Sequence, residues 1–374
     1  MKLEGRVLYL TEDPDKISDQ LRGDDLRFSP DDDMHYGVNT DAMISGRACT
    51  LGYTPTILGP YFLENFKETV AKDDVRSGGF QVVVGGDAYG SGSSREVAVV
   101  AHQGAGIELV IARSFQRIFQ ENMVYAGMPF TTDYGVVDRL KSGEDVDTSE
   151  FFDELPPFFN QVANRGGLLS YANAWLEGQV DPWYDTDTPP RPLNVVEKIA
   201  AARAWSGGRP GVDGGARFGI NAVGPGDQVL CRAGFRGMHE YTAGMVMALY
   251  EEAFGKVPVQ DPDQCASFED HFVLIDQPTV PDSVKSTRLA PARRLAAEMV
   301  EACESHGIRL HGPGRKHQAG VCHRIVVEEY ARPGDVVVLT DSHSPTAGVL
   351  NAFAFGVGST AMAFALRTGL IPVT

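Results

Sequence analysis

The sequence predicts an α/β protein, because short β-rich runs alternate with helical runs in both halves of the chain. In the first half, residues 80–84 and 109–112 are apolar and rich in β-branched side chains, which is typical of buried strands. In the second half, residues 227–230 and 335–339 show the same pattern. Residues 90–96 form a glycine-rich turn between a strand and a helix, an arrangement that favours anion binding.

Helices are expected between the strands of the first half. Residues 97–103 form a helical run that ends at Gly104. Residues 114–125 form a second run, which Gly127 and Pro129 close. This part of the chain is therefore predicted to be a compact α/β domain.

The second half begins after a polar, proline-rich passage at residues 181–192. We predict a first domain over residues 1–175, a linker over residues 176–193 and a second α/β domain over residues 194–374. The second domain is expected to open with a helix near Asn194.

Two further helices are predicted in the second half. Residues 292–305 place Leu295, Met299 and Cys303 on one helical face. Residues 347–367 are small and apolar, and we interpret them as a tightly packed helix that approaches a glycine-rich turn.

Composition limits the classes of partner. The chain has 374 residues, which suggests two or three domains, and its formal net charge is −17. That charge argues against nucleic acids, RNA included, and against anionic membranes as partners. No apolar run approaches the roughly 20 residues of a membrane span. We read no signal peptide at the N-terminus and expect a cytoplasmic protein, because the five cysteines are scattered and form no C-x-x-C pair or metal signature.

The turn at residues 90–96 carries side chains that could bind an anion or react. Arg95 can hold a carboxylate through two parallel hydrogen bonds. Ser93 or Ser94 could be a reacting hydroxyl whose charged form is stabilised by the surrounding amide donors. Local chemistry alone favours a plainer interpretation, a phosphate-binding turn or a helix cap, because glycine-rich strand-to-helix turns are common.

Taken with its neighbours, this turn resembles the swivel domain of the aconitase superfamily, which includes isopropylmalate and homoaconitate dehydratases. The G-x-G-S-S-R-E pattern occupies residues 90–96, and S-F-x-R-I-x-x-x-N occupies residues 114–122. The T-D-x-I-x-P-x-R loop lies at residues 40–47, where Met43 replaces the isoleucine and Ser45 the proline.

The second half resembles the start of the large, cluster-bearing part of the same enzymes. Its motifs occur in the family order: Glu197-Lys198-Ile199, His239-Glu240-Tyr241-Thr242, Asp270-His271, Gly320-Val321-Cys322-His323 and Asp341-Ser342-His343-Ser344. The resemblance implies an aconitase-type swivel domain (β/β/α) followed by a partial three-layer α/β/α aconitase-like domain.

The resemblance also implies roles for residues of the swivel half. Ser93 would be the base, acting as an alkoxide that removes a proton next to a carboxylate. Arg47, Ser94 and Arg95 would bind the substrate. Two of these residues have a plainer alternative: Ser93 as a helix cap, and Arg95 as the partner of an acidic neighbour such as Glu96.

In the second half, the resemblance assigns acid and orienting roles to His271, His323 and His343. Asp270 would pair with His271, and Asp341 would support His323, since a carboxylate behind an imidazole raises its pKa and fixes its tautomer. The residues expected to contact substrate there are His239, Thr242 and Ser342.

The implied activity is a hydro-lyase that dehydrates and rehydrates a small 2-hydroxy di- or tricarboxylate. The implied cofactor is a 4Fe–4S cluster, but none of the five cysteines stands in a matching context. We therefore expect the cluster ligands on a partner chain, in a split enzyme, or on a missing segment. The alternative is a non-catalytic assembly or regulatory subunit that retains the fold without the cluster.

Overall fold

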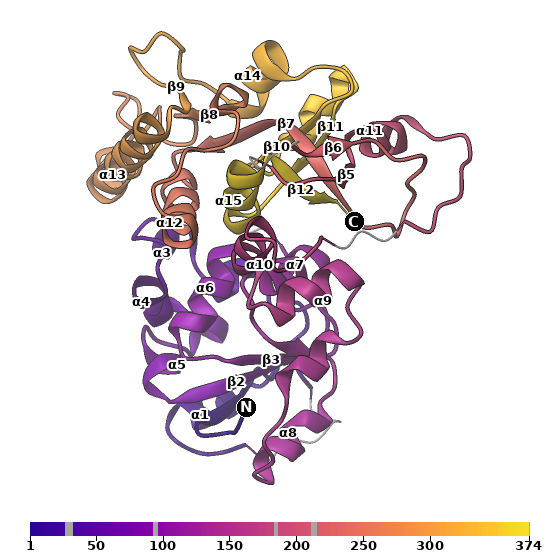
Figure 1. Cartoon of the computed structure of the whole chain (residues 1–374). Helices are drawn as coiled ribbons and strands as arrows, with labels where there is room; N and C mark the ends of the chain where they lie inside the picture. Colours follow the sequence, from indigo (N-terminus) through magenta and orange to yellow (C-terminus); the bar gives the residue numbers. More distant parts are fainter. Residues whose placement is uncertain (27–32, 93–95, 183–185, 211–214, 374) are drawn as a thin grey trace. The chain divides into compact units, whose positions relative to one another are not determined.

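A computed structural model describes residues 1–26, 33–92, 96–182, 186–210 and 215–373 (Figure 1). The chain divides into two compact units. Unit 1 comprises Met1–Leu155 and Val162–Gly167, and unit 2 comprises Pro156–Gln161 and Leu168–Thr374.

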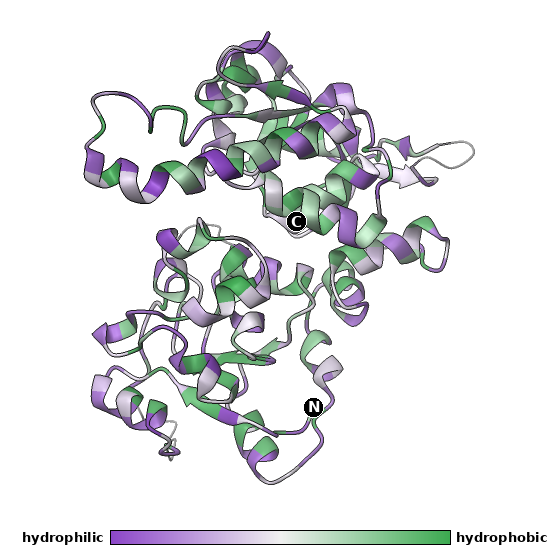
Figure 2. Cartoon of the chain, turned by 90° about the vertical axis from the view of Figure 1, so that its left-hand side faces the viewer, coloured by the Kyte–Doolittle hydropathy of each residue, from purple (hydrophilic) through white to green (hydrophobic). Residues whose placement is uncertain are grey.

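Unit 1 is built on a four-stranded parallel sheet with the strand order β1-β2-β3-β4. Its strands are β1 (Arg6–Tyr9), β2 (Phe80–Gly85), β3 (Leu109–Ala112) and β4 (Phe130–Thr131). Every residue of β2 and β3 is buried, as expected for a parallel sheet covered on both faces. These two strands appear as apolar segments in Figure 2, and they confirm the strands predicted at residues 80–84 and 109–112.

Short helices surround this sheet. They are α1 (Pro14–Leu21), α2 (Thr40–Met43), α3 (Gly46–Cys49), α4 (Pro55–Leu58), α5 (Asp74–Ser77), α6 (Glu96–Gly104), α7 (Arg117–Tyr125) and α8 (Gly135–Lys141). The helix predicted at residues 97–103 is confirmed as α6. The helix predicted at residues 114–125 begins only at Arg117, because Phe115 forms a bridge with Tyr89 and the chain is extended there.

Unit 2 contains a larger sheet with the strand order β11-β10-β7-β8-β9, in which all neighbours are parallel. A sixth strand, β12, pairs with β7 in the antiparallel sense. The strands are β7 (Val229–His239), β8 (Cys265–Phe268), β9 (Arg309–His311), β10 (Val336–Leu339), β11 (Phe353–Gly356) and β12 (Leu370–Val373). A small antiparallel pair is formed by β5 (Trp205–Gly207) and β6 (Arg217–Phe218).

The helices of unit 2 lie before and between these strands in the chain. They are α10 (Leu168–Leu176), α11 (Val195–Arg203), α12 (Ala243–Phe254), α13 (Asp282–His306), α14 (Cys322–Ile325), the π-helical turn η5 (Val326–Tyr330) and α15 (Ser359–Thr368). The helix predicted near Asn194 is confirmed, since Asn194 and Glu197 form a capping box at the start of α11. The helix predicted at residues 292–305 is also present, within the longer α13.

The single helix predicted at residues 347–367 is wrong. The structure has a 3₁₀ segment η6 (Ser344–Leu350), the strand β11 and then the helix α15. Asn351 adopts a left-handed conformation with φ of 60°, which ends η6. The following residues pair with β10, and Gly358 caps α15.

The compact units divide the chain earlier than the boundary that the sequence suggested. Helix α9 (Pro157–Asn164) spans the division, and α10 belongs to unit 2. The reason lies in α10, where Trp175 is buried in an edge-to-face contact of 5.7 Å with Trp205. Asn173 Nδ2 also donates a hydrogen bond of 2.8 Å to the carbonyl of Ala253.

The predicted linker is bound to unit 2 where the structure describes it. The backbone N–H of Asp187 donates to Asp227 Oδ1 at 3.1 Å, and the Arg191 guanidinium pairs with both carboxylate oxygens of Glu197. Among the described helices, none combines the length and the apolar character that crossing a lipid bilayer requires.

Candidate functional site

The motif residues of unit 2 gather at one edge of its sheet. His239 is the last residue of β7, Asp270 and His271 follow β8, and Asp341 follows β10. Because β7, β8 and β10 are parallel, their carboxyl ends meet at the same edge, where α/β proteins bind ligands. The sheet thus brings together residues that are far apart in the sequence.

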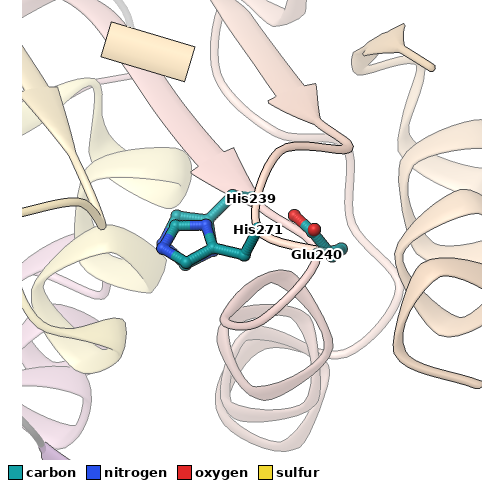
Figure 3. A group of neighbouring side chains, drawn as sticks. All are labelled: His239, Glu240 and His271. Carbon is teal, nitrogen blue, oxygen red and sulfur yellow. The ribbon is translucent and has the colours of Figure 1, made fainter. Parts of the chain in front are cut away.

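His239 and His271 form a stacked pair at this edge. Their ring centroids are 4.1 Å apart with an interplanar angle of 29°, and Figure 3 shows the two rings face to face. His239 Nε2 donates to the carbonyl of Thr340 at 2.9 Å, and its Nδ1 accepts from the N–H of Tyr241 at 3.3 Å. Burial lowers the pKa of His239 to about 4. The ring is therefore neutral near pH 7, with both nitrogens engaged by the backbone.

Glu240 holds the loop that carries Asp270 and His271. One carboxylate oxygen accepts the backbone N–H of Asp270 at 3.0 Å, and the other accepts that of Phe272 at 2.6 Å. Its side chain is buried, and burial raises its pKa. Sequence reasoning did not single out Glu240, although its place inside the His239 motif was a usable signal.

Asp270 contacts the chain segment that bears His323. Its Oδ2 accepts the backbone N–H of Cys322, the first residue of α14, at 2.9 Å. The distance from the same oxygen to His271 Nδ1 is 3.8 Å, within ion-pair range but longer than a hydrogen bond. The predicted pairing of Asp270 with His271 is thus a contact that depends on protonation of His271.

His323, Asp341 and His343 form a second arrangement at the same edge. His323 Nδ1 lies 3.1 Å from Asp341 Oδ1, which also accepts the backbone N–H of His343 at 3.2 Å. The rings of His323 and His343 stack with centroids 5.0 Å apart. The Asp341 carboxylate is almost fully buried, whereas the His343 side chain is 70% exposed. A buried carboxylate on Nδ1 fixes the imidazole tautomer and leaves Nε2 for proton transfer.

Two predicted substrate contacts lie beside these histidines. Ser342 Oγ is 3.1 Å from His343 Nδ1. Thr242 Oγ1 is 2.5 Å from Thr340 Oγ1, on the residue whose carbonyl holds His239. The contacts of Thr242, Ser342 and His239 with substrate stay predictions.

In unit 1, the glycine-rich turn lies against residues 38–40, where the T-D-x-I-x-P-x-R loop begins. The N–H of Thr40 donates to the carbonyl of Ser91 at 2.9 Å, and that of Gly90 donates to the carbonyl of Val38 at 2.9 Å. Gly90 has a φ of +81°, and a Cβ at this position would lie 2.2 Å from the side chain of Phe119. Only glycine fits there, because both the backbone conformation and the close approach exclude a side chain.

The residues that sequence reasoning placed at the mouth of this turn, Ser93, Ser94 and Arg95, lie outside the described residues. Helix α6 begins directly after them at Glu96. Arg47, on α3, has a side chain that is 77% exposed and lies 3.9 Å from Glu64. Such an exposed pair contributes little to stability, so the guanidinium remains accessible to an anion. Its contact with substrate stays a prediction.

Comparison with known proteins agrees with this arrangement. Residues 224–374 match the aconitase family (aconitate hydratase), and residues 65–132 match the aconitase C-terminal domain. The chain is 30% identical over 154 residues to 3-isopropylmalate dehydratase small subunit 1 of Archaeoglobus fulgidus, covering 37% of this chain and 92% of that protein. The chain belongs to the aconitase superfamily.

Two other relatives lie within the aconitase superfamily. The isopropylmalate/citramalate isomerase small subunit of Methanocaldococcus jannaschii is 34% identical over 152 residues, which cover 36% of this chain and 86% of the relative. Aconitase AMT8 of Alternaria alternata is 42% identical over 186 residues, 46% of this chain and 22% of that protein. The predicted resemblance and α/β fold are thus confirmed, with the swivel region ahead of a partial aconitase domain.

Aconitase-family enzymes generally use a 4Fe–4S cluster, which cysteine thiolates bind. The five cysteines here are all buried, and burial raises the pKa of Cys231 and Cys303 to about 12 and that of Cys265 to about 11. Among the described residues, no group of possible metal ligands contains more than one cysteine. The cysteines of this chain therefore do not fit the role of cluster ligands.

Proposed function

We propose that this chain is one subunit of an aconitase-type hydro-lyase that acts on a small 2-hydroxy di- or tricarboxylate by dehydration and rehydration. The observation that carries the proposal is the buried Asp341 carboxylate behind His323, at the carboxyl edge of the unit 2 sheet. Relatives named as dehydratase and isomerase small subunits support this reaction class.

The proposal gives His323 the central proton-transfer role. Asp341 accepts from Nδ1 of the ring, so Nε2 is the atom that exchanges a proton with the substrate oxygen. His343 stacks on His323 and extends into solvent, which suits an orienting role toward a carboxylate. His271 is the second candidate acid, because its side chain is 43% exposed and lies near Asp270.

In unit 1, the proposal assigns the base to Ser93 and substrate binding to Arg47, Ser94 and Arg95. The support is the neighbouring backbone. Gly90 and Gly92 both have positive φ values, and a bridge between Ser91 and Asn39 joins the turn to the start of the T-D-x-I-x-P-x-R loop. Backbone N–H groups of such glycine-rich turns favour anion binding.

A second polypeptide completes the proposed enzyme. Two observations support this: the buried cysteines of this chain do not fit a cluster, and two of the relatives are named as small subunits. We propose that the partner supplies three cysteine ligands for a 4Fe–4S cluster. The side chain of the substrate is left open among alkylmalate-like, homocitrate-like and citrate-like acids.

The test is reconstitution with the chain that co-purifies from the native source. Iron and sulfide are measured in the complex, and formation of the unsaturated acid is followed with 3-isopropylmalate, citramalate, homocitrate and citrate. We expect turnover of at least one acid, with loss of turnover in the Ser93→Ala and His323→Gln complexes. Unchanged turnover in Ser93→Ala would instead favour a non-catalytic subunit, and a complex without iron contradicts the cofactor assignment.

A further inference from the structure

A second cluster of side chains with metal-binding chemistry lies in unit 2 and has no role in the proposed reaction. It consists of His311, the last residue of β9, His317 in the following turn, and Glu329 in η5. One ligand atom from each of the three side chains lies within 4.8 Å of the other two. None of these residues belongs to the motifs that identified the family.

The backbone holds the two histidines side by side. His311 and His317 form a β-bridge, and the N–H of Gly312 donates to the carbonyl of His317 at 2.9 Å. Their ring centroids are 5.0 Å apart. Between them Gly314 has a φ of +69°, which helps the chain to loop back so that His317 lies beside His311 in a parallel bridge. The backbone that carries the two histidines is therefore already ordered before a ligand binds.

His311 is already in the tautomer that a metal ligand needs. It is 1% exposed, and its Nδ1 donates to the carbonyl of Gln318 at 3.2 Å. Its Nε2 therefore carries a lone pair, which now accepts from the Tyr330 hydroxyl at 2.5 Å. A backbone carbonyl on one ring nitrogen is the usual support for a histidine that binds metal through the other. Burial also lowers the pKa of His311, which favours the neutral, metal-binding form.

Glu329 supplies the charged ligand. It lies on the π-helical turn η5, a type of turn that occurs frequently at functional sites. The Arg309 guanidinium lies 5.4 Å from the ring centroid of Tyr330 and opposes cation binding. The Glu329 carboxylate offsets that charge, because its negative charge acts on His311 as well.

We propose that His311 Nε2, a ring nitrogen of His317 and the Glu329 carboxylate bind one first-row divalent cation of the Zn²⁺ type. Two imidazoles and one carboxylate are a ligand set that Zn²⁺ accepts, with metal–nitrogen distances of about 2.0–2.1 Å. The Tyr330 hydroxyl gives up its hydrogen bond to His311 when the metal takes the Nε2 lone pair. Small rotations of the His317 and Glu329 side chains close the site.

The metal would brace the chain segment that carries His323. Residues 318–328 run from the His317 turn to η5, and this segment includes α14 with Cys322 and His323. A cation held by His317 and Glu329 ties both ends of the segment to β9. This inference does not depend on the proposed activity, because binding and stability report on it directly.

The experiment is a titration of the metal-free, untagged full chain with Co²⁺, followed by the visible absorption of the bound ion, and with Zn²⁺ in competition. We expect His317→Asn and Glu329→Gln each to lower the affinity of one metal site. The loss should exceed the roughly 10- to 100-fold that removal of an outer-shell partner of a metal ligand causes. Tyr330→Phe should bind at least as tightly as the wild type, because the competing hydroxyl is gone.

The matched control is His35→Asn, which removes a histidine that lies 2.8 Å from Glu12 and belongs to none of the groups of possible metal ligands found among the described residues. The control should leave the titration unchanged. Because Glu329 is exposed, Glu329→Gln should fold and can test metal binding even if His317→Asn fails to fold. Wild-type affinity in both His317→Asn and Glu329→Gln would overturn the proposal, as would a wild-type chain that binds neither ion.

Discussion

The two stacked histidine pairs of unit 2 are built from the same side chains but are held differently. The inner ring of the first pair, His239, has both nitrogens bound by backbone groups and is buried. In the second pair, His323 is held by the Asp341 carboxylate, and its partner His343 extends into solvent. The comparison shows that the hydrogen-bond partners of the ring nitrogens decide the role of a histidine. A ring with both nitrogens bonded to the backbone is held in place, whereas a ring with a carboxylate on Nδ1 keeps Nε2 for proton transfer.

The largest expected effect is on the second pair. His323→Gln in the assembled enzyme should lower kcat by about 10²- to 10⁴-fold, the usual contribution of a positioned acid or base. Asp341→Asn should lower it in the same direction, because the tautomer of His323 is no longer fixed. Steady-state kinetics on the purified complex measures both effects.

The matched control removes the carboxylate from another histidine–carboxylate contact of unit 2. Glu251 lies 3.2 Å from His306 Nε2, on α12 and α13. Glu251→Gln should therefore leave kcat unchanged. Equal losses in Glu251→Gln and Asp341→Asn would show that the effect is general instability and would remove the distinction between the pairs.

The next effect concerns the first pair and is one of stability. The pKa of His239 is about 4 in the folded chain, below its usual value of 6.5. Stability from its neutral form is thus complete above pH 6.5 and is lost as the pH falls toward 4, by up to about 3 kcal/mol. Urea unfolding at several pH values should show a shallower slope for His239→Asn than for the wild type.

His102 of unit 1 is a second buried histidine with which the pH dependence of His239 can be compared. It is fully buried, its Nδ1 donates to the carbonyl of Ala98 and its pKa is also about 4. His102→Asn should flatten the pH dependence of unit 1 only, whereas His239→Asn should flatten that of unit 2. If the slope stays that of the wild type in His239→Asn, the ring is not held neutral.

A smaller effect is expected at Glu240, which connects the two pairs through the Asp270 loop. Glu240→Ala leaves the N–H groups of Asp270 and Phe272 without their acceptor and should destabilise unit 2 by about 1–3 kcal/mol. Glu240→Gln keeps one acceptor and should cost less. Chemical denaturation near pH 7 ranks the three proteins.

Glu240 also has the opposite pH dependence to His239. Its pKa is raised in the folded chain, so the stability it contributes is present below its unfolded pKa and is lost as the pH rises through its folded pKa. Glu240→Gln should therefore gain stability relative to the wild type as the pH increases from about 4.5. A gain toward lower pH would contradict the assignment.

The smallest effect is expected at Ser342. Its hydroxyl makes a hydrogen bond of 3.1 Å with His343 Nδ1 at an exposed position. Ser342→Ala should lower kcat by about 10-fold or less, the worth of a single hydrogen bond. A loss as large as that of His323→Gln would mean that the hydroxyl contacts substrate directly.

Much of the architecture could be predicted from the sequence because local signals agreed with the fold. The buried strands β2 and β3 are short runs rich in valine, isoleucine and leucine, and α11 starts at a capping box. The motifs singled out His239, Asp270 and Asp341 one by one, and the parallel strands β7, β8 and β10 of the structure bring them to one edge.

Other features depend on contacts that local patterns do not contain. Residues 353–356 form β11 because they pair with β10, although their composition suits a helix equally well. The engagement of both nitrogens of His239 depends on Thr340, about a hundred positions away in the chain. The cluster of His311, His317 and Glu329 needs a turn and a π-helical segment to form, and neither has a clear sequence signal.

The pairing of β12 with β7 has a consequence for how the protein is made. β12 is hydrogen-bonded to the first residues of β7, and β7 ends at His239. A ribosome synthesises residues 370–373 long after β7 has left the exit tunnel, whereas the sheet of unit 1 is complete once β4 has emerged. Unit 1 can therefore fold during translation while the edge of β7 that binds β12 stays unpaired. Until β12 emerges, this edge of β7 can pair with other chains, which is the general hazard of an unpaired strand edge.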